Sequence, residues 1–288
     1  MAAGYGTRLE PLTLAVPKPM VPIVNKPTML HNIQLLRKYG VKEIAANIHY
    51  HPEQIKNFFG SGRLFDVKLS YSYEEELMGT AGGVKRMAEE FADIGSTFIV
   101  LSSDALTDIN LRKLVEFHKK KNALVTMAMA EVEDTSPFGV LVVDKDGRII
   151  GFQEKPAPED AESRWVNAGI YVFEPEVLNF IPKGEFYDFG KQVFPELVKR
   201  GERVFGYKMI EYWSDVGNLS QYHKANADAM QGSVRIRIPG RKVSSQTWMD
   251  KGANVDKSAQ FDGSIILGKR VHIGKNVKIT GETIIGDM

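Results

Sequence analysis

The 288-residue sequence contains no cysteine. A disulfide framework, a thiolate metal site and a cysteine nucleophile are therefore excluded. No apolar run approaches the ~18 residues of a membrane-spanning helix, and residues 1–20 lack the apolar core of a secretory signal. The net charge is +1, whereas nucleic-acid-binding proteins carry a strong basic excess. We therefore expect a cytoplasmic enzyme with no nucleic-acid or membrane partner.

Apolar, β-rich runs alternate with helical patterns in the first four fifths of the chain. Residues 42–50 and 97–104 are predicted strands, and residues 28–40, 79–95 and 110–121 are predicted helices. This alternation predicts an α/β, Rossmann-like fold with a mixed, mainly parallel sheet. Further predicted elements are a hairpin at 138–156, strands at 165–173 and 203–217, and a closing helix at 218–232.

From residue 249 onward, apolar residues recur at every sixth position. This period is typical of a hexapeptide β-helix, in which three hexads form one triangular coil; a pair of ordinary hairpins is the alternative. We expect a catalytic domain at 1–232, a linker at 233–248 and a short left-handed β-helix at 249–288. Because an uncapped solenoid leaves an apolar edge, we expect the β-helix to be incomplete, and we expect a homo-oligomer. The seven positions are Met249, Val255, Phe261, Leu267, Ile273, Ile279 and Ile285.

A glycine-rich turn at residues 4–6 is followed by Thr7 and Arg8, and Lys18 stands between two prolines. The turn lacks the third glycine of a dinucleotide fingerprint and the Gly-Lys-Ser/Thr of a P-loop. Its amides can point at a polyphosphate whose charge Arg8 and Lys18 would neutralise. Taken alone, the stretch also fits a solvated surface turn.

Two aspartates follow extended runs, Asp104 after residues 98–101 and Asp215 in the sequence YWSDVG. Ligands of open α/β sheets bind at the carboxyl ends of strands. Two carboxylates together with phosphate oxygens are a usual Mg²⁺ arrangement. A helix cap or a turn is the alternative for each, and Asp108 is interpreted as the cap of the helix that begins near residue 110.

Together these segments resemble the sugar-1-phosphate nucleotidylyltransferases, also called nucleotide-sugar pyrophosphorylases. The resemblance covers residues 1 to about 230 and is greatest for bacterial mannose-1-phosphate guanylyltransferases. Pro17-Lys18-Pro19 differs from the Ser-Lys-Gln that is usual in the thymidylyltransferase branch. The matching segments are GYGTRLEPLTLAVPKPMVPIVNKP (4–27), LMGTAGG (77–83), SSDALTD (102–108), FGVLVVDKDGRIIGFQEKP (138–156), VNAGIYVFEPEV (166–177) and YWSDVGNLSQY (212–222).

The resemblance implies a role for each matching residue. Arg8, Lys18, Asp104 and Asp215 would be catalytic, and the two aspartates would bind Mg²⁺. Glu154 would bind sugar hydroxyls and Lys155 the sugar phosphate, with Gly139 and Asn167 lining the sugar pocket. The nucleoside triphosphate would be held by Ala3, Gly4, Gly6, Thr7, Arg8, Gly79, Thr80 and Gly82, with Gly79 to Gly82 under the base.

The implied reaction transfers a nucleotidyl group from a nucleoside triphosphate to a sugar-1-phosphate and releases pyrophosphate. GTP and mannose-1-phosphate are the favoured substrates, with glucose-1-phosphate uridylyl-, thymidylyl- or adenylyltransferase activity as alternatives. A non-catalytic subunit that binds a nucleotide sugar is another alternative, and a hexapeptide acyltransferase using His272 is the weakest. The sugar phosphate is already an anion, so positioning and charge neutralisation replace a general base.

Two features depart from the family pattern. Ser103 stands where the family usually has glycine, and family members usually have a short apolar strand before Ala2. Such a strand would be central, and its loss would cost several kcal/mol of stability. We therefore expect Met1 to be an internal methionine of a longer natural chain.

Overall fold

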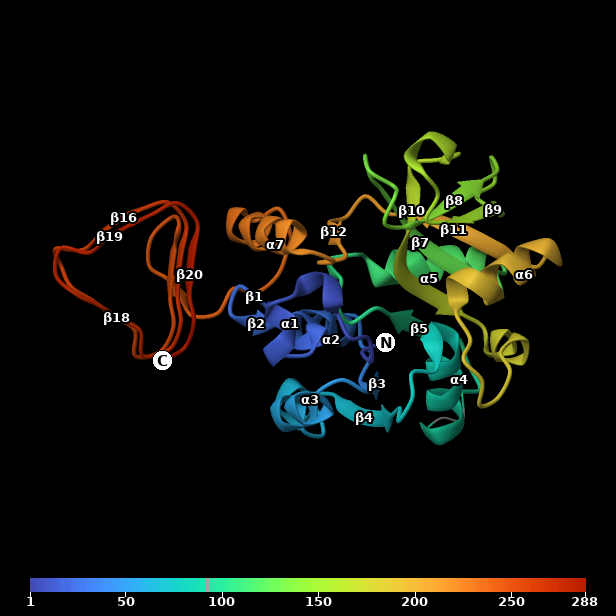
Figure 1. Cartoon of the computed structure of the whole chain (residues 1–288), viewed down its shortest axis with the longest axis horizontal. Coiled ribbons are helices and arrows are strands. Elements are labelled where there is room, and N and C mark those ends of the chain that lie inside the picture. Colours follow the sequence, from blue (N-terminus) through green and yellow to red (C-terminus); the bar gives the residue numbers. More distant parts are fainter. Residues whose placement is uncertain (92–93) are drawn as a thin grey trace.

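The computed structural model describes residues 1–91 and 94–288. Figure 1 shows an α/β body and, beyond helix α7, a separate coil of short strands that carries the C-terminus. The helices are α1 (Leu12–Ala15), α2 (Thr28–Lys38), α3 (Pro52–Phe59), α4 (Gly79–Phe91), α5 (Leu111–Lys120), α6 (Phe194–Lys199) and α7 (Leu219–Gln231). The predicted helix at 79–95 corresponds to α4, and residues 92–93 lie outside the described part of the chain.

The strands of the body are short except for one long central strand, β10. They are β1 (Pro22–Ile23), β2 (Lys26–Pro27), β3 (Glu43–Ile48), β4 (Lys68–Tyr73), β5 (Phe98–Leu101), β6 (Leu106–Thr107), β7 (Val125–Glu131), β8 (Gly139–Val143), β9 (Ile149–Glu154), β10 (Trp165–Phe173), β11 (Val204–Lys208) and β12 (Trp213–Ser214).

The largest sheet has the order β11-β7-β10-β8-β9, with β5 also paired to β10. Strands β11 and β7 are parallel. The other pairings in this sheet are antiparallel: β10 with β5, β7 and β8, and β8 with β9. The expectation of a mainly parallel sheet is therefore wrong for it. The reason is β10, which is antiparallel to three neighbours. Val166 pairs with Val140 of β8 and with Ala130 of β7, and Ile170–Phe173 pair with β5. A separate pair, β3 and β4, is parallel.

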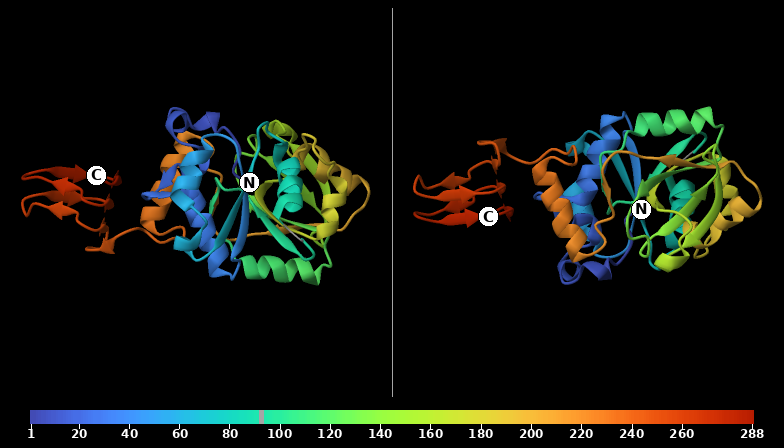
Figure 2. Two further views of the ribbon diagram at one scale, coloured as in Figure 1. Left: turned by 90° about the horizontal axis from the view of Figure 1, so that it is seen from below. Right: turned by 90° about the horizontal axis from the view of Figure 1, so that it is seen from above.

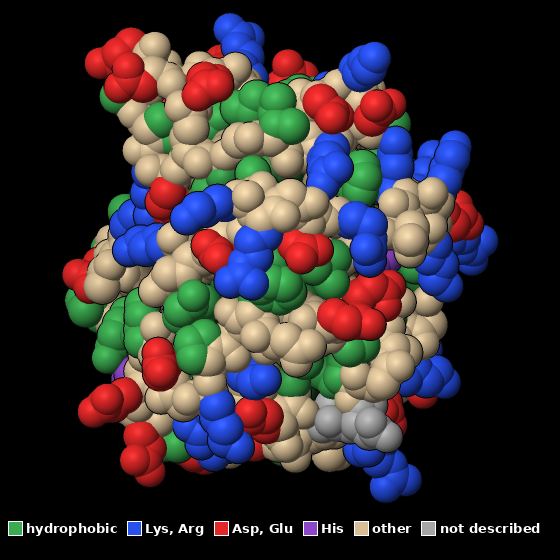
Figure 3. Space-filling view, turned by 90° about the vertical axis from the view of Figure 1, so that its right-hand side faces the viewer, with side chains coloured by type: hydrophobic (Ala, Val, Ile, Leu, Met, Phe, Trp, Pro, Cys, Tyr) green, Lys and Arg blue, Asp and Glu red, His purple; other side chains and the backbone are tan. Residues whose placement is uncertain are grey.

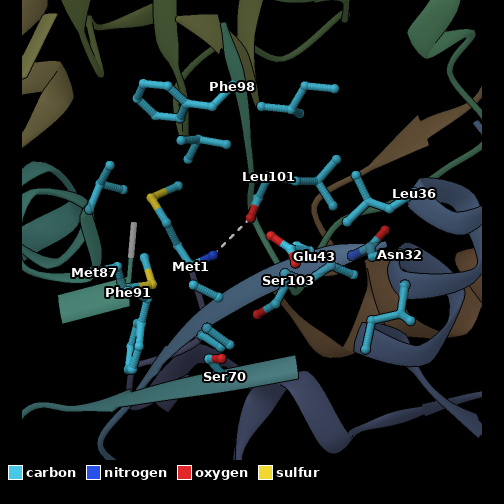
Figure 4. A pocket seen from close by; sticks show the side chains of 18 of the residues that line it. Met1, Asn32, Leu36, Glu43, Ser70, Met87, Phe91, Phe98, Leu101 and Ser103 are labelled. Atoms are coloured by element: carbon cyan, nitrogen blue, oxygen red, sulfur yellow. Dashed lines mark hydrogen bonds between the residues drawn. The ribbon is translucent and has the colours of Figure 1, made fainter. Parts of the chain in front are cut away.

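A cavity of about 400 Å³, lined by polar and apolar residues, separates β3 from β5 (Figure 4). The other edge of each strand is paired, β3 with β4 and β5 with β10. Met1 lies in this cavity; its ammonium donates to the Leu101 carbonyl at 2.8 Å, and its carbonyl accepts from the Ser103 amide at 3.0 Å. Burial lowers the pKa of this amine to about 6, despite the charges of Asp104 and Glu74. The Ala2 amide donates to Asn47 Oδ1 of β3 at 2.8 Å, so the first two residues connect the largest sheet to the β3–β4 pair.

The C-terminal strands stack in register with a spacing of 18 residues. Thr247 pairs with Ile265 and Ile265 with Thr283, all in parallel. All seven apolar positions of the six-residue period lie in one apolar cluster inside this coil. Figure 2 shows the layers of the coil edge-on. Its strands are β13 (Arg241–Lys242), β14 (Thr247–Met249), β15 (Asn254–Val255), β16 (Gln260–Asp262), β17 (Ile265–Leu267), β18 (His272–Ile273), β19 (Lys278–Thr280) and β20 (Thr283–Ile285).

The coil packs against the body through one of its sides. Ile266 and Ile284 join an apolar cluster with Met230 of α7 and with Val234. The side-chain Nδ2 of Asn25 donates to the Ile285 carbonyl at 2.9 Å. Apolar packing and a hydrogen bond therefore hold the coil against the body, in addition to the covalent connection after α7.

Charged side chains of both signs are interspersed on the end of the body that faces away from the coil (Figure 3). This mixture agrees with the net charge of +1. Among the residues that the structure describes, no helix has the length and hydropathy needed to cross a membrane.

Candidate active site

A short strand pair brings the two predicted aspartates to one place. Asp104 lies between β5 and β6, and Asp215 directly follows β12. Strands β6 and β12 pair antiparallel, with Leu106 opposite Ser214. The two carboxylates therefore come from segments more than one hundred residues apart, as the sequence predicts.

Lys18 joins both segments. Its Nζ lies 2.6 Å from Asp104 Oδ2 and donates to the Asp215 carbonyl at 3.3 Å. The other oxygen of Asp104 accepts from the Ser102 hydroxyl at 2.6 Å. Burial alone raises the pKa of Asp104, but the charge of Lys18 and the hydrogen bonds from Lys18 and Ser102 outweigh it and hold this pKa below its ordinary value.

Asp215 has the opposite shift. Burial, together with the charge of Asp104, raises the pKa of Asp215, while Lys18 and Arg8 oppose the rise. The four residues predicted to be catalytic thus lie within electrostatic reach of one another. Asp104 and Asp215 repel each other, and Lys18 neutralises only part of their charge. A further cation would therefore be stabilised beside them.

The glycine-rich turn lies against Lys18. Gly6 has φ +73°, and a Cβ there would lie 2.8 Å from Lys18 Cβ. Its carbonyl accepts from the Thr13 hydroxyl at 2.9 Å. Gly6 therefore permits both the left-handed turn and the close approach of Lys18. Of the other predicted turn residues, Ala3 is buried, whereas Gly4 and Thr7 are exposed.

The second glycine-rich segment packs on the loop before the π-helix at Phe189–Val193. A Cβ at Gly79 would lie 2.5 Å from the Tyr187 carbonyl oxygen, and one at Gly82 would lie 2.7 Å from that of Glu185. The amides of Ala81 and Gly82 both donate to the Tyr187 carbonyl. Glycine is thus required here by protein backbone, a reason that the sequence does not reveal. The Thr80 hydroxyl donates to Asp188 Oδ2 at 2.8 Å.

The predicted sugar-binding residues gather around Glu154. Gly139 is paired with Glu154 across β8 and β9, and a Cβ at Gly139 would lie 3.2 Å from Glu154 Oε2. A Cβ at Gly190 would lie 2.9 Å from the same oxygen and 3.4 Å from Asp188 Oδ1. The Lys155 side chain is 60% exposed, and its Nζ lies 3.8 Å from Glu154 Oε1. Glu154 therefore lies beside the loop that carries Asp188, and Asp188 in turn accepts the hydrogen bond from Thr80.

A bulge in β10 connects the sugar-binding group to the aspartates. The register of β10 shifts between Asn167 and Tyr171. Within the bulge, Gly169 accepts from the Ser102 amide at 2.9 Å and donates to Asn167 Oδ1 at 3.0 Å. Asn167 Nδ2 donates to the Tyr171 hydroxyl at 2.9 Å. Hydrogen bonds thus link Ser102, which lies beside Asp104, through the bulge to Tyr171.

Two polar residues of this region, Asp188 and Tyr171, were not predicted. Asp188 and Tyr171 lie beside Glu154, and burial, with smaller contributions from both carboxylates, raises the pKa of Tyr171. Asp188 caps the π-helix by accepting from the amides of Gly190 and Lys191, a cap signal that the sequence offered. Asp108 is a correction: Asn110 caps α5, whereas Asp108 accepts from Tyr212 and Arg235.

Within the described residues, no group of three or more His, Asp or Glu side chains could hold a metal ion by itself. A metal at this site would need oxygens from a bound phosphate besides those of Asp104 and Asp215. The donor set, two carboxylates with room for substrate oxygens, is of the kind that Mg²⁺ prefers.

Comparison with known proteins places the chain in a family. The nucleotidyl transferase family model matches residues 1–232. The chain is 38% identical to a UTP–glucose-1-phosphate uridylyltransferase of Synechocystis sp., over 99% of this chain and 77% of the relative. It is 31% identical to a mannose-1-phosphate guanylyltransferase of Mycobacterium tuberculosis, over 99% and 78% respectively.

A crystal structure of a putative glucose-1-phosphate thymidylyltransferase from Bacillus anthracis has a similar fold. Its TM-score is 0.70 at 25% identity, and the match covers 79% of this chain and 92% of that one. Family match, relatives and fold agree with one another. The chain belongs to the nucleotidyl transferase family, as the motifs of its sequence predicted.

Proposed function

We propose that this chain transfers a nucleotidyl group from a nucleoside triphosphate to a sugar-1-phosphate and releases pyrophosphate. The observation that carries the proposal is the cluster of Arg8, Lys18, Asp104 and Asp215 at the end of β5. The bulge of β10 joins this cluster to Asn167 and the group around Glu154. A triphosphate and a phosphorylated sugar could therefore lie end to end along the site.

The reaction follows from the charges. An oxygen of the sugar phosphate attacks the α-phosphorus in line, and the bond to pyrophosphate breaks. Because the attacking oxygen is already anionic, no side chain needs to remove a proton. Arg8 and Lys18 would neutralise the charge that builds on the leaving pyrophosphate, and Glu154 would fix the sugar by accepting hydrogen bonds from its hydroxyls.

Asp104 and Asp215 would hold Mg²⁺ together with phosphate oxygens. When bound, the ion would supply charge neutralisation and orientation of the phosphates. Lys18 Nζ, which lies 2.6 Å from Asp104 Oδ2, would then also contact a phosphate oxygen bound beside this carboxylate.

We favour GTP and mannose-1-phosphate as the substrate pair. The stretch Pro17-Lys18-Pro19 and several relatives named mannose-1-phosphate guanylyltransferase support this choice. UTP and glucose-1-phosphate are the second candidate pair, because the Synechocystis uridylyltransferase has 38% identity over almost the whole chain. Gly79, Thr80 and Gly82 would lie near the base of either nucleotide.

We also infer that residues 249–288 form a left-handed hexapeptide β-helix that mediates a homo-oligomer of a cytoplasmic enzyme. The 18-residue register and the single internal apolar cluster support the coil. Light scattering of the whole chain tests the assembly, and the 32.2 kDa mass of one chain in dilute solution would contradict it.

A pyrophosphate-release assay with Mg²⁺ tests the reaction. GTP, UTP, ATP and dTTP are each combined with mannose-, glucose- and N-acetylglucosamine-1-phosphate. Release with GTP and mannose-1-phosphate alone supports the favoured pair, and release with UTP and glucose-1-phosphate alone supports the second. Binding of a nucleotide sugar without release in any combination would show a regulatory subunit instead.

A further inference from the structure

Val216 has a backbone conformation that valine rarely adopts. It directly follows Asp215 and has φ +44°, in the left-handed region. A β-branched side chain is crowded there, whereas glycine takes this conformation without steric cost. The neighbouring Gly217 nevertheless does not take it. Strain of this kind persists where the surrounding structure fixes the residue, and it is frequent at functional sites.

The surroundings of Val216 are an apolar cluster. Its side chain is 1% exposed and joins Leu106, residues of α7 and Ile266 of the coil. Helix α7 lies between the coil and β12 (Figure 1). Leu106 lies two residues after Asp104 and pairs with Ser214. The two segments that carry the aspartates therefore pack on the same apolar cluster, and this cluster holds the valine in its strained conformation.

The backbone on either side of Val216 holds the Asp215 carboxylate. Asp215 Oδ1 accepts from the Gly217 amide at 3.2 Å, and a Cβ at Gly217 would lie 2.5 Å from Asp215 Oδ2. The Gly217 amide also donates to Gln221 Oε1 at 3.0 Å, and Asn218 caps α7. The direction of the carboxylate therefore depends on the course of the chain between Asp215 and Gly217, which Val216 determines.

Lys18 contacts the same stretch of backbone. Its Nζ donates to the Asp215 carbonyl at 3.3 Å and lies 2.6 Å from Asp104 Oδ2. This carbonyl belongs to the peptide bond that joins Asp215 to Val216. A change in the backbone of Val216 would therefore reach Asp215 and Lys18 together.

We propose that Val216 is a positioning residue, which fixes the direction of the Asp215 carboxylate and its carbonyl contact with Lys18 and so preorganises the place where the phosphates react. The proposal rests on the proposed function. The valine acts through its neighbours and not by contact with a substrate. Because preorganisation acts on the reacting groups, its loss lowers turnover more than it lowers substrate affinity.

The variants Val216→Gly and Val216→Thr test the proposal. Glycine removes the branched side chain and frees the backbone, whereas threonine keeps the branched shape and adds a hydroxyl to the apolar cluster. For Gly we expect kcat to fall about tenfold or more, with both KM values changed less than about threefold. For Thr we expect a lower melting temperature, because of the buried hydroxyl, with kcat within about threefold of the wild type.

Val24→Gly is the matched control. Val24 is a second left-handed valine, with φ +43°, and is fully buried in the same apolar cluster. It lies in the turn between β1 and β2, where its amide donates to Asn226 Oδ1 at 2.9 Å. Val24→Gly should lower the melting temperature as Val216→Gly does, but leave kcat within about threefold of the wild type. Thermal melts confirm that each variant is folded at the assay temperature.

Equilibrium dialysis with GTP and with UTP, each in Mg²⁺ and in EDTA, gives a measurement without turnover. The ratio of the two affinities is the gain that Mg²⁺ provides. Because this gain depends on the direction of the Asp215 carboxylate, it should shrink about threefold or more in Val216→Gly and persist in Val24→Gly. The affinity in EDTA should be the same in both variants as in the wild type.

These measurements separate the possible failures. If the wild type binds neither nucleotide and releases no pyrophosphate, the proposed function and this inference both fall. If the wild type is active and Val216→Gly keeps its kcat, the positioning role alone is overturned. Equal losses of kcat in Val216→Gly and Val24→Gly would also overturn it, because the packing of the whole cluster would then be responsible.

Discussion

Lys18 Nζ and Asp104 Oδ2 are 2.6 Å apart, and the lysine side chain is 12% exposed. This ion pair holds positive charge where the proposed reaction would need it, before any substrate binds. Because Lys18 also donates to the Asp215 carbonyl, it ties together the two segments that carry the aspartates. The lysine therefore has a structural role in the free protein and, in the proposed reaction, a phosphate-neutralising role in the complex.

Replacing Lys18 with methionine should lower kcat about 100-fold or more, since a charge aimed at the leaving group is lost. The matched control is Lys26→Met, because Lys26 Nζ also donates to a backbone carbonyl, that of Arg237 at 2.9 Å. Steady-state pyrophosphate release measures both. Equal rates for the Lys18 variant and the control would contradict the phosphate role.

Asp104→Asn and Asp215→Asn should each abolish turnover while the chain stays folded. The amide keeps the shape of the side chain but removes the charge on which a bound cation depends. Circular dichroism checks the fold, and pyrophosphate release at several Mg²⁺ concentrations checks the activity. A near-normal rate in either variant would remove that aspartate from the metal site.

Gly6→Ala and Gly4→Ala form a pair that tests the combined effect of backbone strain and crowding at Gly6. Gly6 has φ +73° and no space for a Cβ beside Lys18, whereas a Cβ at Gly4 would meet nothing within 4 Å. Gly6→Ala should destabilise the fold by about 1–3 kcal/mol and reduce activity, while Gly4→Ala should leave stability nearly unchanged. Chemical denaturation gives the two values, and equal values would contradict the explanation.

The structure brings together four residues that the sequence singled out, whereas the prediction of a mainly parallel sheet is wrong for the largest sheet. Few residue types other than charged ones can bind phosphates or a cation, so such residues can be recognised in the sequence without knowledge of the fold. They are Arg8, Lys18, Asp104 and Asp215. Strand direction is not encoded in this way. The apolar run that forms β10 is the same whether it lies parallel or antiparallel, and its neighbours β5, β7 and β8 come from distant parts of the chain.

Other elements were missed because their residues favour a different local structure. Strand β7 contains the sequence VTMAMAE, whose alanines and methionines are good helix formers. Six of its seven residues are buried between β10 and β11, and burial outweighs that preference. Val216 was also missed, since a left-handed backbone favours glycine and Gly217 stands next to it in the sequence.

His31 should make the stability of the protein depend on pH. It is 4% exposed on α2, with Nε2 3.0 Å from the Ile23 carbonyl, and among the described residues Nδ1 has no hydrogen-bond partner. Burial lowers its pKa from 6.5 to about 4, against the smaller effect of that hydrogen bond. His31 of the unfolded chain therefore takes up a proton near pH 6.5, whereas in the folded chain it does so only near pH 4. Stability from this residue is complete above the unfolded pKa and is lost as the pH falls through this window, by about 3 kcal/mol in total.

Urea unfolding of the wild type and of His31→Gln between these two pH values measures the effect. Glutamine can still donate to the Ile23 carbonyl but cannot take up a proton, so its stability should fall less steeply with decreasing pH, by up to about 1.4 kcal/mol per pH unit. The exposed His272 provides the control, because His272→Gln should keep the wild-type slope. Buried His118 has a pKa lowered chiefly by burial and adds to the wild-type slope in the same direction, so some slope should remain in His31→Gln. Parallel curves for wild type and His31→Gln would show that His31 is protonated in the fold as readily as in the unfolded chain.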